Sequence, residues 1–395
     1  MTLIKKRTMT YIYINPLITA EHENFRLKIR DFAENSVGPK AAGLDATGTF
    51  SEELTSAMGK LGLLGMTVPG KYGGSDLDTL SYIIAVEELA RIDGSQAATI
   101  AAQNSLGLAP IVKYGTEEQR QKFLPGLLSG SRLWAFGLTE RNAGSDANNT
   151  ETEAIRDGND WVINGQKIFI TNSASSLSAG ATIQAVTGMK DGRKELTVIM
   201  VERDAPGYSC EPITNKMVWR AADTGKLYFN NCRVPISNTL GQPGQGPHIM
   251  LETLDSGRLS IAAMGLGLAQ GAFEMAMTYA EKRVQFGKSI SKFQAISFKL
   301  ADMALKLELA RNMLYKACWQ KDQKLPFGKE AAMAKLYCSE IAKEIADESL
   351  QIHGAYGLIK ESPIERFYRD QRILQIGEGT SEILKLVISR HIGIK

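Results

Sequence analysis

The chain has 395 residues, of which 44% are hydrophobic and 23% are charged, and its formal net charge at pH 7 is +3. These proportions are those of a globular protein with two or three domains, and they exclude a chain that is disordered throughout. So small a net charge does not favour nucleic acid or an acidic membrane surface as a partner. No stretch of about 18 apolar residues predicts a membrane span.

The N-terminal residues and the cysteines bear on the compartment. Residues 1–19 are predicted to be an extension and not an export signal, because Pro16, Glu21 and Glu23 interrupt the apolar stretch that follows the first basic residues. The four cysteines and four histidines are widely spaced and form no zinc-binding pattern, so we expect no metal site. The default compartment is therefore the reducing cytoplasm.

Residues 20–132 are predicted to form an N-terminal helical domain. Apolar residues recur at helical spacing over residues 80–90. Thr116, followed three positions later by Gln119, is typical of a capping box at the start of a helix.

Residues 133–242 are predicted to form a middle β-domain. Short runs of strand-forming residues alternate with turns that contain glycine and asparagine. These runs lie at 161–163, 167–171, 181–186, 196–202 and 227–229. Short strands at this spacing favour a barrel or a sandwich.

Residues 243–395 are predicted to form a C-terminal four-helix bundle, which makes the fold mainly α with a central β-domain. The four helices are expected at 259–282, 295–321, 329–353 and 381–392. The first contains Gly265, Gly267 and Gly271, although glycine costs about 1 kcal/mol in a helix. These small residues therefore predict that another helix approaches closely.

Several familiar motifs are missing from the sequence. There is no P-loop, no nucleophile elbow and no metalloprotease H-E-x-x-H. Gly265, Gly267 and Gly271 miss the dinucleotide-binding spacing by one residue and lie inside a predicted helix. A nicotinamide site, a hydrolase and a metalloenzyme are therefore not favoured.

Four segments remain that plain packing does not explain. They are residues 138–146 (LTERNAGSD), 165–172 (GQKIFITN), 283–288 (RVQFGK) followed by Gln294, and a C-terminal set of 351–357 (QIHGAYG), Arg366 and 377–382 (GEGTSE). Taken together and in this order, over residues 20–392, they resemble the acyl-CoA dehydrogenase family of flavoproteins. The family's architecture is a helical domain, a β-domain and a four-helix bundle, the same division that the periodicity predicts.

The resemblance implies a reaction and its partners. Enzymes of this family use FAD to remove two hydrogens from the α and β carbons of an acyl-CoA thioester, giving trans-2-enoyl-CoA. Electrons then pass to an electron-transferring flavoprotein, and the enzyme is a homotetramer (a dimer of dimers) with FAD between subunits. Two alternatives stay open: a flavoenzyme of the same fold that uses oxygen or a carrier-bound acyl group, and a non-catalytic helical scaffold.

Glu378 is the candidate catalytic base. The α-hydrogen of a thioester is weakly acidic, and a desolvated carboxylate with a raised pKa can remove it. Residues 377 and 379 are glycines, which let backbone and substrate approach closely. By itself Glu378 is equally an acid at a helix start; the resemblance implies the catalytic role. Some family members place the base immediately before Arg258, where this chain has Gly257, which has no acid to offer.

The resemblance also assigns residues to the cofactor. Thr139, Ser145 and Thr171 are by themselves ordinary turn or cap hydroxyls, and Arg283 suits a helix C-terminus, yet the family places such residues at the flavin and the pyrophosphate. This chain has Arg141 where the family usually has proline. The full set expected at FAD is Phe136, Leu138, Thr139, Ser145, Phe169, Ile170, Thr171, Arg283, Phe286, Gln294, Gln351, Ile352, His353, Gly354, Ala355, Thr380, Ser381 and Glu382.

The expected substrate-binding residues are Ser145, Asp255, Arg258 and Gly379. Asp255 and Arg258 are predicted to open the long helix as an exposed ion pair, or, by the resemblance, to line the CoA channel. Members that act on glutaryl groups carry an arginine at the place of Ala97, so the acyl group is expected to be uncharged at its far end. Gly377 replaces an aromatic residue common in the family, which leaves room for a branched or bulky acyl chain.

Overall fold

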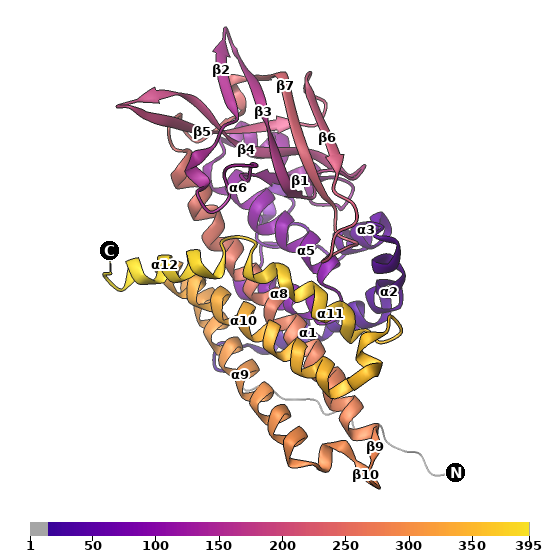
Figure 1. Ribbon diagram of the computed structural model, residues 1–395. Helices are drawn as coiled ribbons and strands as arrows, with labels where there is room; N and C mark the ends of the chain where they lie inside the picture. The colour runs from indigo at the N-terminus through magenta and orange to yellow at the C-terminus, as the bar shows by residue number, and fades with distance from the viewer. Residues whose placement is uncertain (1–14, 395) are drawn as a thin grey trace.

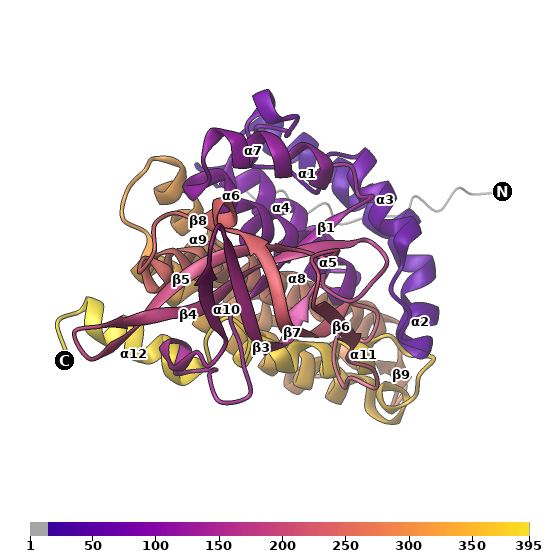
Figure 2. The same ribbon diagram turned by 90° about the horizontal axis from the view of Figure 1, so that it is seen from above.

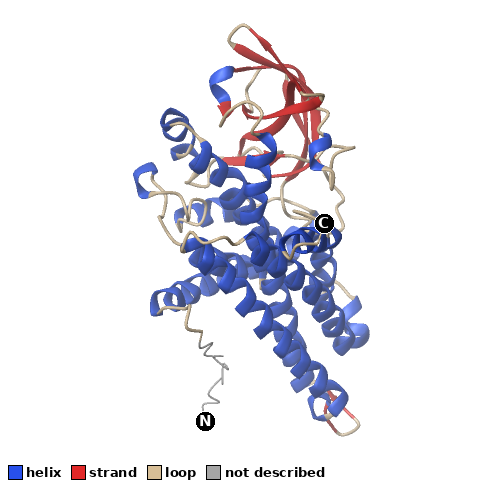
Figure 3. Ribbon diagram, turned by 90° about the vertical axis from the view of Figure 1, so that its left-hand side faces the viewer, coloured by secondary structure: helices blue, strands red, loops and turns tan. Residues whose placement is uncertain are grey.

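The computed structural model describes residues 15–394, so most of the predicted extension over residues 1–19 lies outside the described residues. The β-sheet caps one end of an elongated helical body, and β9 and β10 lie at the opposite end (Figure 1). Viewed from the side, nearly all strands gather at that one end (Figure 3). The predicted fold class, mainly α with a central β-domain, is confirmed.

The N-terminal part is helical, as expected. The Thr116–Gln119 capping box is present at the start of α7, with Thr116 Oγ1 accepting from the Gln119 backbone N–H at 3.2 Å. Two π-helical turns, Ala33–Val37 and Gln103–Leu108, interrupt the helices. The helices are α1 Ala20–Phe32, α2 Gly38–Thr47, α3 Glu52–Lys60, α4 Thr79–Ala90, α5 Gly94–Ala102, α6 Ala109–Tyr114 and α7 Glu117–Phe123.

The strands β1 to β8 pair as one sheet in the described part of the chain, in the order β6-β7-β3-β2-β4-β5-β8, with β1 parallel to β4. Figure 2 shows this sheet lying across the helices. All five runs of strand formers fall inside strands, and the sequence pattern missed β1, β2, β6 and β8. The strands are β1 Leu133–Gly137, β2 Glu153–Asp157, β3 Asp160–Thr171, β4 Ser178–Lys190, β5 Arg193–Glu202, β6 Tyr208–Pro212, β7 Thr224–Pro235 and β8 Thr239–Leu240.

The C-terminal part contains the long helices. These are α8 Gly246–Lys282, α9 Gln294–Asp322, α10 Gly328–His353, α11 Ile364–Asp370 and α12 Ser381–His391, with the hairpin strands β9 Val284–Gln285 and β10 Lys288–Ser289 between α8 and α9. The expectation that Asp255 and Arg258 open the long helix is wrong, because α8 begins at Gly246. Pro247 fits the first turn of α8, where its missing N–H needs no partner.

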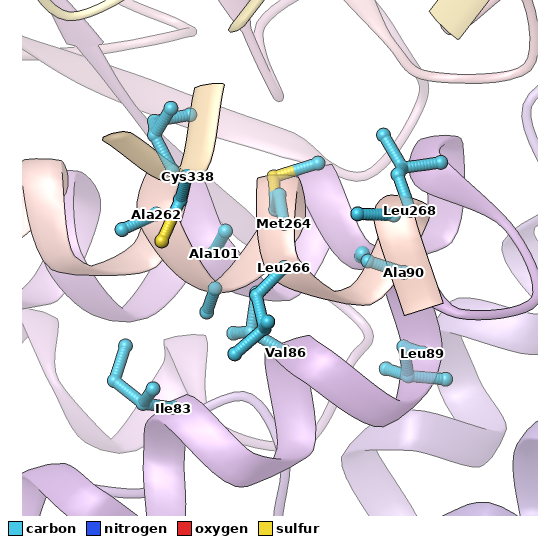
Figure 4. Packing of buried hydrophobic residues seen from close by; sticks show 14 of the residues in the cluster. Ile83, Val86, Leu89, Ala90, Ala101, Ala262, Met264, Leu266, Leu268 and Cys338 are labelled. Carbon is cyan, nitrogen blue, oxygen red and sulfur yellow. The ribbon is translucent and has the colours of Figure 1, made fainter. Parts of the chain in front are cut away.

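Helix α8 packs tightly between α4 and α10, as its small residues predicted. A Cβ atom at Gly265 would lie 2.8 Å from the Cys338 carbonyl oxygen of α10. On the other side, a Cβ at Gly267 would lie 2.3 Å from the Glu87 carbonyl oxygen of α4. The close-up of this core shows α8 side chains such as Met264 and Leu266 between the neighbouring helices (Figure 4). By length and composition α8 could cross a membrane, but most of its apolar stretch is buried inside the protein.

A cluster of buried charges joins α4 to its neighbours. Glu88 accepts hydrogen bonds from Arg30 of α1 at 2.9 Å and from Arg91 at 3.2 Å. Glu87 accepts from Arg311 of α9 at 2.9 Å. Burial raises the pKa of Glu88, but Arg30 and the other guanidinium groups outweigh it and hold that pKa at about 2. The paired charges therefore fix how α1 and α9 dock on α4.

Replacing Gly267 by alanine should destabilise the protein by about 1–3 kcal/mol, because the added methyl overlaps the α4 backbone. The matched control is Gly43→Ala, at an exposed position inside α2 with no atom within 4 Å of the added Cβ. It should stabilise the protein by about 0.5–1 kcal/mol. Denaturant unfolding of the two variants checks both signs, and equal stability would contradict the packing described for α8.

Candidate active site

Glu378 lies in a short connection between the 3-10 turn Gln371–Gln375 and helix α12. Its backbone is left-handed, with φ of 53°, and Gly379 follows with φ of 101°. Left-handed backbone is costly for a residue with a Cβ and is often found at functional sites. Thr380 then caps α12, its hydroxyl accepting from the Ile383 backbone N–H at 3.3 Å. Because of this conformation, Glu378 lies outside both helical segments, just before the N-terminus of α12.

The Glu378 carboxyl group has few partners. Its Oε2 atom is buried and has no hydrogen-bond partner among residues 15–394. Burial raises the pKa of Glu378 to about 7, while the positive charges of Lys335 and Arg258 lower it. Within the same residues, no acceptor is found for the Glu378 backbone N–H. The site thus combines a carboxylate of near-neutral pKa with a free backbone donor, as general-base chemistry requires.

Gly257 of α8 faces this carboxyl group. A Cβ atom at Gly257 would lie only 1.8 Å from Glu378 Oε2 and 3.1 Å from Leu106 Cδ2. The absence of a side chain at position 257 is therefore what leaves room for Glu378. The two positions that the resemblance offers for the base, directly before Arg258 and at Glu378, therefore lie next to each other in this fold.

Arg258 and Asp255 form the predicted ion pair on one face of α8. The expectation that the pair is exposed is wrong for Arg258, which is only 5% exposed. Its Nε atom is buried without a hydrogen-bond partner in the described part of the chain. Because Arg258 also acts on the pKa of Glu378, it belongs to the same site.

In the β-domain, a buried ion pair holds the two segments expected at the flavin. Lys167 Nζ of β3 lies 2.6 Å from Glu140 Oε1, and both side chains are buried. The same Nζ donates to the Leu138 carbonyl oxygen at 3.3 Å. The Ile168 backbone N–H donates to the Thr139 carbonyl oxygen at 2.9 Å. The loop after β1 and the end of β3 are therefore fixed side by side.

A bulge shapes the end of β3. The pairing of β3 with β7 shifts register between Lys167 and Ile170, and Phe169 within it is left-handed, with φ of 62°. As a result Phe169 is 65% exposed while Ile170 is buried. Bulges of this kind re-aim side chains beside binding sites. Of the other expected contacts here, Phe136 and Leu138 are buried, Thr139 and Thr171 are half-buried and Ser145 is exposed.

The other expected cofactor residues lie at the far end of the bundle. Arg283 caps α8, and its guanidinium carbon lies 5.7 Å from the centre of the Tyr356 ring. No ion pair is described for Arg283 within residues 15–394. Phe286, in the turn between β9 and β10, is 94% exposed. Gln294, the first residue of α9, is exposed as well.

The end of α10 completes this second group. Gln351 is exposed, but Ile352 and His353 are buried, and the His353 ring stacks on Tyr279 with centroids 4.4 Å apart. Gly354 has φ of 59°, which favours glycine, whereas Ala355 is not left-handed. The alanine in place of the family's second glycine is thus compatible with the backbone.

The two groups are not brought together within one chain. Gly257, beside Glu378, lies in α8, and Arg283 caps the C-terminal end of the same helix. At 1.5 Å of rise per residue they are about 39 Å apart along the helix. Thr380, Ser381 and Glu382 stay with Glu378; the Ser381 hydroxyl donates to Glu340 of α10 at 2.5 Å.

The sequence reasoning missed Lys335 and the Lys167–Glu140 pair. Lys335 is fully buried and donates to the Gly379 carbonyl oxygen at 2.6 Å. The sequence did contain a signal for the burial of Lys335. Small or apolar residues recur three or four positions apart along one face of α10, at Ala331, Cys338 and Ala342, and Lys335 occupies one position of that face. A lysine on the buried face of a helix needs a specific partner.

Three family models match the chain in order. They are the acyl-CoA dehydrogenase N-terminal domain at residues 19–131, the middle domain at 135–232 and the C-terminal domain at 244–393. Among curated relatives, the probable acyl-CoA dehydrogenase YngJ of Bacillus subtilis is 46% identical over 376 residues, covering 95% of this chain and 98% of the relative.

Solved structures are also similar. Butyryl-CoA dehydrogenase from Megasphaera elsdenii has a TM-score of 0.92 and 40% identity, covering 96% of this chain and 100% of that chain. A chain from a structure described as the electron transferring flavoprotein of Acidaminococcus fermentans gives a TM-score of 0.93 and 39% identity, over 97% and 100%. An acyl-CoA dehydrogenase complexed with FAD from Bacillus anthracis gives 0.89 and 33%, over 96% and 68%.

Proposed function

The chain belongs to the acyl-CoA dehydrogenase family, whose members are oxidoreductases that act on CH–CH groups. On that premise we propose that it converts an acyl-CoA thioester into a trans-2-enoyl-CoA. The observation that carries the proposal is the buried, unpartnered Oε2 of Glu378, whose pKa burial raises to about 7. FAD is the proposed cofactor and an electron-transferring flavoprotein the proposed electron acceptor. The similarity to the Acidaminococcus chain supports that acceptor.

The site residues have distinct roles in this reaction. Glu378 removes the α-proton of the thioester as general base. The backbone N–H of Glu378, which has no acceptor among the described residues, hydrogen-bonds the thioester oxygen as negative charge develops there. Arg258 and Lys335 keep the carboxylate ionised enough to act, because their positive charges oppose the effect of burial on its pKa.

The residues present fit FAD. The bulge in β3 exposes Phe169, and the half-buried Thr139 and Thr171 belong to the two segments held side by side there; such a surface suits a planar ring. Arg283, with no ion pair in the described chain, suits a pyrophosphate. FAD bound there would supply the capacity for a two-electron oxidation, with the β hydrogen of the substrate leaving as hydride.

We propose further that the enzyme is a homotetramer, a dimer of dimers, with FAD held between subunits. The separation of about 39 Å along α8 between the Glu378 and Arg283 regions supports this arrangement. In it, Arg283, Phe286 and Gln294 of one subunit, with its residues 351–355, would help to hold the FAD that serves Glu378 of another subunit. A cytoplasmic location and a place in fatty acid or amino acid catabolism belong to the same proposal.

The proposed substrate is a short acyl-CoA with no charge at the far end of the acyl chain. The resemblance to butyryl-CoA dehydrogenase motivates the length, and Ala97, fully buried in α5, offers no charge to a distal carboxylate. Ser145, Asp255, Arg258 and Gly379 are the proposed substrate contacts.

Glu378→Gln should fold and retain FAD but dehydrogenate butyryl-CoA about 10²–10⁴-fold more slowly, because an amide cannot accept the proton. Anaerobic bleaching of the flavin absorbance by butyryl-CoA measures the rate. Glu361→Gln, an exposed position before α11, is the control and should match the parent. Near-parental turnover by Glu378→Gln would place the base elsewhere.

Gly257→Ala should fold but lose about 10²-fold in the same assay, since its methyl would lie 1.8 Å from Glu378 Oε2 and push the base aside. Gly43→Ala is the matched control. It is a helical glycine outside the site, with no atom within 4 Å of the added Cβ, and its substitution should change the rate little. If both variants bleached at the parental rate, the carboxyl group would not act from the position described.

A substrate panel tests the acyl pocket. Butyryl-CoA and isobutyryl-CoA should bleach the flavin, and glutaryl-CoA should do so far more weakly, because burying an unpaired carboxylate costs several kcal/mol. A preference for glutaryl-CoA would show that another cation reaches the pocket.

A further inference from the structure

Lys335 is a lysine in a place where an apolar residue would be expected. Its side chain has no exposed surface, and the neighbouring buried positions on the same face of α10 are Ala331, Cys338 and Ala342. Burying an ammonium group is costly unless the protein supplies compensating partners. The contacts of Lys335 therefore indicate what the lysine is for.

One partner of Lys335 is the backbone next to the base. Its Nζ donates to the Gly379 carbonyl oxygen at 2.6 Å. Two further bonds tie α10 to the same segment: Gln375 Nε2 donates to the Ser339 carbonyl oxygen at 2.7 Å, and the Ser381 hydroxyl donates to Glu340 at 2.5 Å. The segment runs from Gln375 to Ser381: Lys335 bonds to its middle, and the other two hydrogen bonds join its two ends to α10.

The held segment is the one whose backbone is strained. Glu378 has φ of 53° and Gly379 has φ of 101°. A non-glycine residue stays in the left-handed region only where the surroundings fix it. The bond from Lys335 to the Gly379 carbonyl fixes the Gly379–Thr380 peptide, the second peptide after Glu378.

The second partner of Lys335 is the charge of the base. The charges of Lys335 of α10 and Arg258 of α8 lower the pKa of the Glu378 carboxyl group, and the Glu378 charge raises the pKa of Tyr82 of α4. The charges that act on the pKa of Lys335 are those of Glu378, Arg258, Glu340 and Glu382. Burial lowers the pKa of Lys335 to about 8, and the Glu378 carboxylate acts against that. Since Arg258 is already paired with Asp255, Lys335 is the cation next to Glu378 that has no carboxylate bonded to it in the described chain.

We propose that Lys335 is a positioning residue for the base: its buried ammonium group holds the Gly379 carbonyl, fixes the left-handed turn at Glu378, and brings a positive charge to the segment that carries the carboxylate. The inference rests on the proposed role of Glu378 and deepens it. Position and charge are two separable effects, because glutamine keeps a donor for the carbonyl but carries no charge, and methionine keeps neither.

The test compares Lys335→Gln and Lys335→Met with the parent holoenzyme and with Lys343→Gln, an exposed lysine on the same helix. The first readout is the titration of Glu378 itself. Infrared difference spectroscopy measures it through the C=O band of the protonated carboxyl group, which is assigned to Glu378 by its absence in Glu378→Gln. The parent should titrate near pH 7 and Lys343→Gln likewise. Both Lys335 variants should titrate about one pH unit higher, because a nearby positive charge is lost.

The second readout is the pH dependence of kcat/KM for butyryl-CoA. The carboxylate is the active form, so activity falls as the pH drops below the pKa of the base. In both Lys335 variants this fall in activity should occur at higher pH. At pH values well above the pKa of the base, Lys335→Gln should recover most of the parental kcat. Lys335→Met should stay about 10-fold lower there, because the turn at Glu378 is no longer held.

An unchanged titration of Glu378 in both Lys335 variants would overturn the inference, as would equal kcat values for glutamine and methionine on the high-pH plateau. A variant that fails to turn over can still be titrated, so loss of activity does not hide the result. If the parent oxidised no acyl-CoA but its Glu378 titration still moved in the variants, the proposed function would fail while the role of Lys335 would stand.

Discussion

Helix α8 lies so close to α4 and α10 that glycine is needed at the points of contact. A Cβ at Gly265 would overlap the α10 backbone, and one at Gly267 or Gly271 would overlap the α4 region. This close packing sets the place of the candidate active site. It fixes α10, which carries Lys335, and α4, which carries Tyr82, relative to Gly257 and Arg258 on α8. Protein interiors resist small changes in volume. The close packing of α4, α8 and α10 therefore also keeps the residues of the candidate active site in fixed positions.

Buried charged residues in the N-terminal domain also hold α4 in place, in addition to its packing against α8. Glu87 and Glu88 of α4 are buried, and arginines from α1 and α9 pair with them. Such buried pairs contribute little net stability compared with apolar packing, but each requires its partner in one place. We infer that they fix the docking of the helices around α4 more than they stabilise the fold.

The sequence predicted local features well and tertiary ones poorly. The capping box at Thr116 and the close approach at Gly265 depend on a few neighbouring residues, and both are present. The helix predicted to begin at residue 259 begins instead at Gly246, and Pro247 suits the first turn of that longer helix. The burial of Arg258 and Lys335 was missed, since periodicity identifies the inward face of a helix but not the neighbour that covers it. For Glu378, the family motif pointed to the residue, and only the fold shows its buried, unpaired oxygen.

The overlap between a side chain at position 257 and the Glu378 carboxyl group restricts how this family can change. An acid at either position would reach the same point, yet both cannot fit at once when a single Cβ already lies 1.8 Å from the carboxyl oxygen. Moving the base from one helix to the other therefore needs two substitutions whose effects depend on each other. Every single-substitution intermediate between the two arrangements either lacks an acid or crowds two into one space. The residue at position 257 and the carboxyl group at 378 therefore share one volume, and a change at either position alters what the other can hold.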